Sequence, residues 1–101
     1  MEIQKIVTGE VHQLFIAGRI DGDGANQLEE EVLKTIRAGA KTIYVNLSAA
    51  TFLCSAGLRV LLQYWRQMKN KQCLLQATRP SPEVEAVLAT SGFKEMLVEK
   101  M

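Results

Sequence analysis

Apolar and polar positions alternate along two stretches near the start of the chain. Residues Ile3 to Val7 and Val11 to Ile20 follow the period of two that is typical of half-buried strands. Between them, Thr8-Gly9-Glu10 has the glycine and polar residues of a tight turn. The pattern therefore predicts an opening β-hairpin.

A longer period follows the hairpin. Apolar residues recur at helical spacing at Ala25, Leu28, Val32 and Ile36. The turn Asp21 to Gly24 precedes them, and its aspartates can accept hydrogen bonds from the first free N–H groups of a helix. The pattern predicts a helix that begins after this turn and ends at Gly39.

The rest of the chain alternates between strand and helix patterns. The expected elements are a buried strand at Lys41–Leu47, a helix at about Ala56–Lys69, a strand at Gln72–Ala77 and a helix from Ser81-Pro82 to Gly92. Two alternatives stay open for Phe93 to Val98, a last strand or a packed tail. Strand and helix alternation implies βα units with parallel neighbouring strands, so we expect an α/β fold with a mixed, mostly parallel sheet packed by helices.

Composition and charge limit the classes of partner. A chain of 101 residues, 48% of them hydrophobic, predicts a single domain over residues 1–101. Its 12 basic and 11 acidic residues are interspersed and leave a formal charge of +1, which predicts neither nucleic-acid binding nor attraction to an acidic membrane. Its start is charged and no apolar run could span a bilayer, so we expect a cytoplasmic protein without membrane insertion.

Polar residues follow each predicted parallel strand. Because such strands end at the same edge of a sheet, we expect Asp21, Asn46 to Ser55 and Thr78 to Ser81 to share one edge. We also expect the chain to pass from the strand through a polar turn to Ser55, where the next helix begins. A hydroxyl there can cap the helix, and the N–H groups of the first turn also favour a phosphate on it. From these residues alone, capping is the simpler interpretation.

Two motifs resemble a known family. They are Asn46-Leu47-Ser48 with Phe52-Leu53 and Ser55-Ala56-Gly57-Leu58, and, upstream, Gly18-Arg19-Ile20-Asp21 followed by Ala25 and Leu28. Together they resemble the STAS domain, the fold of bacterial anti-sigma factor antagonists. The resemblance extends over essentially the whole chain and implies the STAS fold.

The family resemblance also implies a function. In STAS antagonists, the serine that matches Ser55 is phosphorylated by the partner anti-sigma factor, which is also a serine kinase with a histidine-kinase-like ATPase fold. The unphosphorylated antagonist binds this partner and frees the sigma factor for transcription, and phosphorylation dissociates the complex. The resemblance places Asp21, Asn46, Cys54 and Gly57 around the phosphorylation site. Arg59, one turn further on, could hold the phosphate or be a plain surface arginine.

Two residues depart from the family pattern. Phosphorylated members usually have an aspartate immediately before the serine, where this chain has Cys54, and Asn46 also stands where aspartate is common. An alternative function is therefore a STAS scaffold that is not phosphorylated, in a lipid-type ABC transport complex. A weak homodimer is a further alternative that the sequence leaves open.

The helix after Ser55 has a wide apolar face. The residues expected to face the sheet are Leu58, Leu61, Leu62, Trp65 and Met68. Gly57, Val60 and Tyr64 fall on the flank of this stripe. Val60 and Tyr64 are accordingly predicted to bind the partner, with a widened buried face as the equal alternative.

Catalytic patterns are missing from the sequence. The single histidine, His12, lies in the opening hairpin, and Leu53 replaces the first glycine of a nucleophile elbow around Ser55. No phosphate-binding loop, dinucleotide fingerprint or metal-ligand spacing occurs, so we expect no enzyme, cofactor or metal. Cys54 and Cys73 lack paired spacing and are expected as free thiols, Cys73 in the core and Cys54 with a reactive role as the minor alternative.

Overall fold

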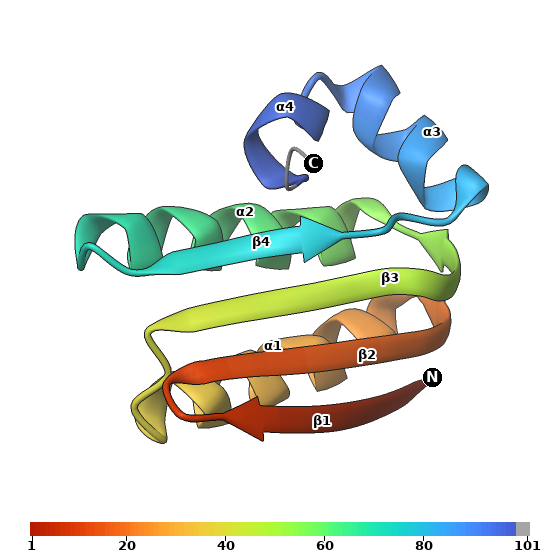
Figure 1. The fold of residues 1–101 in the computed structure, drawn as a ribbon. Helices are drawn as coiled ribbons and strands as arrows, with labels where there is room; N and C mark the ends of the chain where they lie inside the picture. Colours follow the sequence, from red (N-terminus) through yellow and green to blue (C-terminus); the bar gives the residue numbers. More distant parts are fainter. Residues whose placement is uncertain (99–101) are drawn as a thin grey trace.

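The chain folds as a mixed α/β domain in the computed structural model, which describes residues 1–98. Its elements are β1 (Glu2–Thr8), β2 (Val11–Ile20), α1 (Gly22–Arg37), β3 (Thr42–Leu53), α2 (Ser55–Asn70), β4 (Leu74–Thr78), α3 (Pro82–Ser91) and α4 (Lys94–Leu97) (Figure 1). The predicted hairpin and the three longer helices are confirmed. Gly92 ends α3 in the left-handed conformation that helix ends favour, with φ of 80°.

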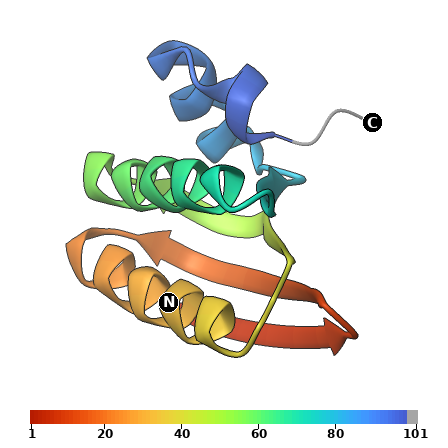
Figure 2. The same ribbon diagram turned by 90° about the vertical axis from the view of Figure 1, so that its left-hand side faces the viewer.

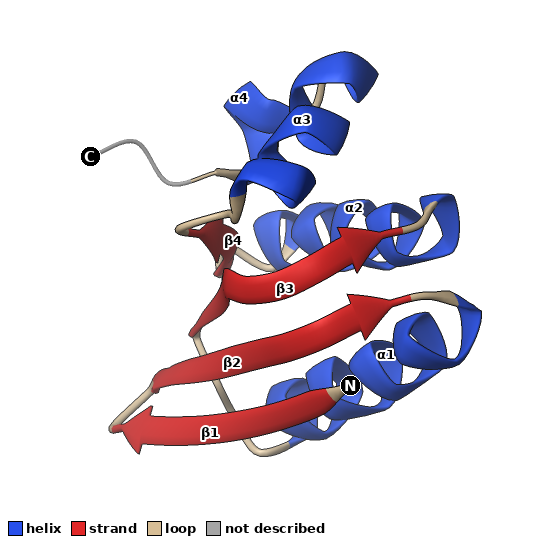
Figure 3. Cartoon of the chain, turned by 90° about the vertical axis from the view of Figure 1, so that its right-hand side faces the viewer, coloured by secondary structure: helices blue, strands red, loops and turns tan. Residues whose placement is uncertain are grey.

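The described strands form one sheet in the order β1-β2-β3-β4. β1 is antiparallel to β2, whereas β2 is parallel to β3 and β3 is parallel to β4. Seen edge-on, α1 and α2 cover the same face of the sheet, and α3 and α4 lie beyond its β4 edge (Figures 2 and 3). No helix within residues 1–98 covers the opposite face of the sheet (Figure 3).

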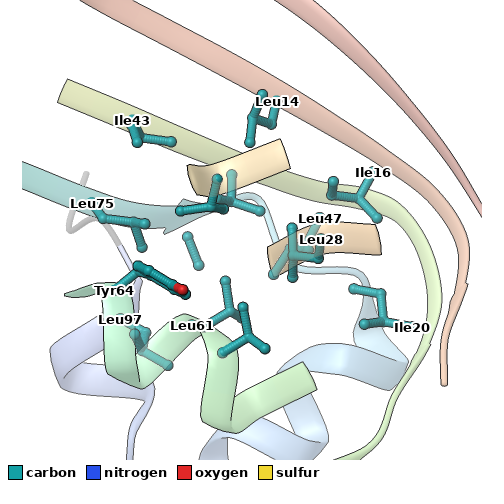
Figure 4. Packing of buried hydrophobic residues seen from close by; sticks show 14 of the residues in the cluster. Leu14, Ile16, Ile20, Leu28, Ile43, Leu47, Leu61, Tyr64, Leu75 and Leu97 are labelled. Carbon is teal, nitrogen blue, oxygen red and sulfur yellow. The ribbon is translucent and has the colours of Figure 1, made fainter. Parts of the chain in front are cut away.

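The hydrophobic core fills the space between the sheet and the two long helices (Figure 4). Alternate residues of the strands point into it, so Leu14 and Ile16 of β2 are buried while Gln13 and Phe15 are partly exposed. Leu28 of α1 and Leu61 of α2 are fully buried opposite them. The core thus joins elements from both halves of the sequence.

The predicted polar turn between Leu47 and Ser55 is wrong, because β3 continues to Leu53. The register of β2 and β3 shifts twice, between Phe15 and Ala17 and between Gly18 and Arg19, and each shift gives β3 one extra residue. Such bulges bend a strand without ending it. Small and polar residues in this segment resemble a turn in sequence, yet Ala50 and Leu53 are buried as strand residues.

The C-terminal part differs from the prediction in two places. Strand β4 begins at Leu74, so Cys73 precedes it and is half-buried instead of lying in the core. The segment after Gly92 forms the short helix α4 instead of a strand, and its Leu97 is fully buried. The packed tail was therefore the correct alternative, with Val98 making a single parallel bridge to Ala77.

Candidate functional site

Ser55 is the first residue of α2 and is exposed to solvent. The helix cap is Cys54, whose side chain makes no capping hydrogen bond. The prediction that Ser55 caps the helix is therefore wrong by one residue. Within residues 1–98, the Ser55 hydroxyl forms no hydrogen bond, which leaves it free to react or to be contacted.

The ends of two strands fix the start of α2. The Cys54 N–H donates to the Ile20 carbonyl at 2.9 Å, which ties the end of β3 to the end of β2. A Cβ atom added to Gly57 would lie 2.7 Å from Ile20 Cγ2 and 2.8 Å from Leu53 Cδ1. Gly57 therefore allows the first turn of α2 to pack directly on the strand ends, and Ser55 faces solvent on the other side.

Asp21 begins α1 beside this point. Its Oδ1 accepts a hydrogen bond from the Gly24 N–H at 2.9 Å, so the predicted capping role is confirmed. Because Ile20 precedes Asp21 and binds Cys54, the structure brings Asp21 to the strand ends from which α2 starts. One oxygen of the exposed Asp21 carboxylate is therefore used to cap α1.

Asn46 lies elsewhere, so its predicted place beside Ser55 is wrong. It pairs with Phe15 and Thr78, and Leu53 follows it seven positions later along β3. At about 3.3 Å per residue this is on the order of 20 Å. Its Oδ1 accepts from the backbone N–H and the hydroxyl of Ser48, at 3.0 and 2.7 Å, and so holds the first bulge of β3.

The predicted common edge is therefore stepped. Strand β4 ends at Thr78, opposite Asn46, while β2 and β3 continue together to Ile20 and Leu53. Asp21, Cys54 and Ser55 lie at the far step. Asn46 and Thr78 lie at the near step, where Ser81 joins α3 to β3 by donating its hydroxyl to the Ala50 carbonyl at 2.5 Å.

Cationic side chains border the Ser55 end of the sheet. The Arg19 guanidinium, which was not predicted as a site residue, stacks on the Phe52 ring at 4.2 Å from its centroid. Arg59 is exposed one turn beyond Ser55, and the first turn of α2 holds no acidic residue. A helix N-terminus with nearby arginines favours added negative charge. The alternation of β2 could have indicated Arg19, since it places this side chain opposite the buried Ile20.

Val60 and Tyr64 are buried, with 9% and 3% of their surfaces exposed. Their prediction as partner-binding residues is wrong, and the alternative of a widened buried face is correct. The α2 residues Leu58, Leu62 and Trp65, predicted to face the sheet, are only half-buried. The buried stripe of α2 is thus rotated toward α1.

A polar contact joins the two long helices on the buried side of α2. The Tyr64 hydroxyl donates a hydrogen bond to Glu29 Oε2 of α1 at 3.0 Å. Figure 4 shows the Tyr64 ring among the buried side chains. Burial and then the hydrogen bond to the Glu29 carboxylate raise the pKa of Tyr64 above its ordinary value of 10.0. Tyr64 is therefore a core residue whose polar end is satisfied by α1.

A different face of α2 remains accessible next to Ser55. Ser55, Leu58, Arg59 and Leu62 follow the spacing i, i+3, i+4 and i+7, which places them on one side of a helix. Ser55 and Arg59 are exposed, and Leu58 and Leu62 are half-buried. We call these four residues the α2 switch face.

The described residues contain neither a metal-binding cluster nor a membrane-spanning helix. None of the His, Cys, Asp and Glu residues within 1–98 form a group suited to a metal ion. Over the same part of the chain, no helix has the length and apolar character needed to cross a membrane.

The fold agrees with the comparison with protein families. The sequence model described as "Mlab, STAS domain" matches residues 4–99, and the chain belongs to this family of STAS domains. The predicted family and the predicted STAS fold are thereby confirmed.

Relatives of the chain include anti-sigma factor antagonists by name. BtrV of Bordetella bronchiseptica, which carries that name, is 29% identical over 92 residues, covering 88% of this chain and 79% of BtrV. The solved structure of the antagonist SpoIIAA in its unphosphorylated form has a TM-score of 0.82 at 24% identity, over 98% of this chain and 89% of SpoIIAA. An antagonist from Mycobacterium paratuberculosis has a TM-score of 0.86 at 19% identity, over 99% and 86% of the two chains. At these identities, the two solved structures show that the fold is shared.

Proposed function

We propose that this protein is an anti-sigma factor antagonist that is released from its partner when Ser55 is phosphorylated. The observation that carries the proposal is the exposed, unbonded Ser55 hydroxyl on the first residue of α2. The relative BtrV is named as an anti-sigma factor antagonist, and SpoIIAA has been solved in a phosphorylated form. The proposed partner is an anti-sigma factor that is also a serine kinase, with a histidine-kinase-like ATPase fold.

The local electrostatics allow phosphorylation without loss of the fold. A phosphoserine carries about −1.5 to −2 charges at neutral pH. At Ser55 this charge would lie at the positive end of the α2 dipole, on an exposed side chain that forms no hydrogen bond within residues 1–98. Arg59 lies one turn further along α2, and its positive charge can attract the phosphate. The phosphate therefore acts on the surface and leaves the core unchanged.

The α2 switch face is the proposed contact surface. Leu58 and Leu62 offer apolar area that a partner can cover, and Ser55 and Arg59 flank this area. A phosphate at Ser55 would bring bulk and charge into that contact. An unpaired charge buried in an interface costs several kcal/mol, and each 1.4 kcal/mol weakens binding about tenfold.

The proposal is tested by measuring the affinity of candidate anti-sigma factors from the same genome for four forms of the protein. Wild type and Ser55→Ala are expected to bind equally, and Ser55→Glu at least about 100-fold more weakly. Thr8→Glu is the matched control, because Thr8 is exposed at the far end of the hairpin and gains the same charge. Equal binding by Ser55→Glu and wild type, with unchanged melting temperatures, would refute the switch.

A second candidate function is a STAS scaffold that is not phosphorylated, in a lipid-type ABC transport complex. The observation that favours it is the side chain before Ser55, which is Cys54 where a carboxylate is common in phosphorylated members. The matching family description also carries the name Mlab. Purification from the native host separates the two functions. A histidine-kinase-like ATPase in the complex supports the antagonist, and a transporter ATPase supports the scaffold.

A further inference from the structure

The face of the sheet opposite α1 and α2 has three successive rows of described residues without a charged side chain. Figure 1 looks onto this face, with both long helices behind the strands. The rows, read from β1 to β4, are Thr8, Val11, Thr42 and Leu74, then Ile6, Gln13, Tyr44 and Gln76, then Gln4, Phe15, Asn46 and Thr78. Charged residues make up 23% of the chain, and the surface of a soluble domain usually carries at least this share. Their absence from these rows is typical of the centre of a protein–protein interface.

Exposed apolar area is concentrated on the same face. Ile6, Val11 and Leu74, which are 56%, 37% and 38% exposed, lie at the hairpin end of the rows. Of the large hydrophobic side chains that are exposed within residues 1–98, only Val7 lies elsewhere, on the helix side of the sheet. Tyr44 adds a partly exposed aromatic ring to this group. Apolar side chains bordered by amides and hydroxyls mark a surface for contact with another protein.

A second copy of this chain is the partner that such a face fits. In complexes between different proteins, complementary charges steer association and select the partner, and these rows offer none. Two identical faces without charge do not repel each other. The formal charge of only +1 also leaves little repulsion between whole molecules.

We propose that two copies pack these faces on each other about a two-fold axis that runs parallel to the strands. β2 of one copy then lies over β3 of the other and β1 lies over β4, so each row meets the same row of the second copy. Tyr44 packs against Gln13 of the second copy, and Ile6 packs against the methylene groups of its Gln76. The apolar hairpin ends therefore lie together, and the amides can form hydrogen bonds across the interface.

The size of the face limits the strength of this contact. At about 4.8 Å between strands and about 3.3 Å per residue, the rows cover a flat area on the order of 400 Å² in each copy. With the relief of the side chains, the two copies would bury on the order of 1,000 Å², which is the lower end of specific interfaces. A reversible dimer with a dissociation constant in the micromolar range is therefore expected.

Both copies of the α2 switch face stay accessible in this dimer. Because α1 and α2 cover the other face of each sheet, the two Ser55 residues lie on the outer sides of the pair (Figures 2 and 3). The dimer would thus present two partner-binding surfaces at once. The contact between the sheets involves neither Ser55 nor the α2 switch face, so it can be tested independently of phosphorylation.

The test is sedimentation velocity of the full chain from micromolar to millimolar concentration. The mean mass is expected to rise from the 11.2 kDa of one chain toward twice that value. In a ¹⁵N-labelled sample, the amide shifts that change with concentration should lie in residues 4–8, 11–15, 42–46 and 74–78.

Gln13→Lys places a charge beside the proposed two-fold axis and is expected to weaken association at least tenfold, because that charge faces its own copy. Gln27→Lys is the matched control, since it makes the same change at an exposed position of α1, and it should associate like wild type. Gln13→Glu alone should also associate weakly. An equal mixture of Gln13→Lys and Gln13→Glu should associate more tightly than either variant alone, because opposite charges then face each other. Unchanged melting temperatures would show that both Gln13 variants are folded.

A constant mass of 11.2 kDa up to millimolar concentration would overturn the proposal. Equal association of Gln13→Lys and Gln27→Lys would do the same, as would a mixture of the two Gln13 variants that associates no better than either one. Concentration-dependent shifts confined to the helices would assign the contact to another surface and contradict the proposed dimer. Shifts on this face only after addition of a different protein would assign the face to that protein instead.

Discussion

Cys54 holds the cap position of α2 without performing the cap. Its backbone is extended, as a cap residue requires, but its side chain accepts no hydrogen bond from the first turn. The free N–H groups there are normally satisfied by Ser, Thr, Asp or Asn. The residue before Ser55 therefore leaves the helix start less stable than it could be.

Replacing Cys54 by aspartate is expected to stabilise the protein. A capping carboxylate would contribute about 1 kcal/mol and would also place a negative charge at the helix N-terminus. Chemical denaturation should show this gain for Cys54→Asp, and Cys54→Ala, which cannot cap, should show none. If Ser55 is phosphorylated by a kinase, Cys54→Asp should also raise the rate of phosphate transfer. A stability equal to that of Cys54→Ala would mean that the first turn is already satisfied.

The raised pKa of Tyr64 should make the free energy of unfolding depend on pH in the alkaline range. Its pKa is raised in the folded protein, by burial and by Glu29, above the ordinary value of 10.0. Above that pH the unfolded chain loses the phenol proton while the folded protein keeps it. The stabilising contribution is therefore complete below about pH 10 and is lost as the pH rises further.

Tyr64→Phe should remove this pH dependence and the hydrogen bond to Glu29, which has a value of about 1.5 kcal/mol. Urea unfolding at pH 8 should show the stability loss, and a series from pH 9 to 11 should give a flatter curve than wild type. Tyr44→Phe serves as the control because Tyr44 lies on the open face of the sheet. An identical slope for Tyr64→Phe and wild type would contradict the assigned contact.

At the scale of the elements, the contact between α2 and the strand ends positions Ser55. Gly57 makes this contact possible, since a Cβ there would lie 2.7 and 2.8 Å from buried side chains. Gly57→Ala should consequently destabilise the protein by about 1 to 3 kcal/mol through overpacking, despite the better helix propensity of alanine. Gly22→Ala, on α1, is the matched control because its Cβ would meet nothing within 4 Å.

The measurement is the unfolding free energy of both variants in urea. Gly22→Ala should be as stable as wild type or slightly more stable. A Gly57→Ala protein as stable as wild type would show that α2 can move away from Ile20 and Leu53 without cost. In that case Ser55 would not be held in place by this packing.

Local sequence patterns predicted most of the elements, and they failed where tertiary pairing decides. The hairpin, α1 and α3 follow from alternation, helical spacing and cap residues, all of which act within a few residues. The extension of β3 to Leu53 depends on pairing with β2, which no local signal reports. In the same way, the hydrogen bond that satisfies the buried Tyr64 hydroxyl comes from Glu29, 35 residues earlier in the chain.

For the whole molecule, the order of strands decides which predicted site residues meet. Parallel β2 and β3 end together and bring Asp21, Cys54 and Ser55 to one place, as topology alone predicted. The early end of β4 separates Asn46 from them, because strand lengths could not be fixed from sequence. This stepped edge separates the α2 switch face from Asn46 and Thr78.

The central claim is that Ser55 is the regulated residue of an anti-sigma factor antagonist. The most direct measurement is mass spectrometry of the full chain after incubation with its cognate anti-sigma kinase and ATP. One phosphate is expected on Ser55 in the wild type and none in Ser55→Ala, with both proteins folded. Phosphate on Ser48 or Thr51 instead, or an equal yield in Ser55→Ala, would contradict it.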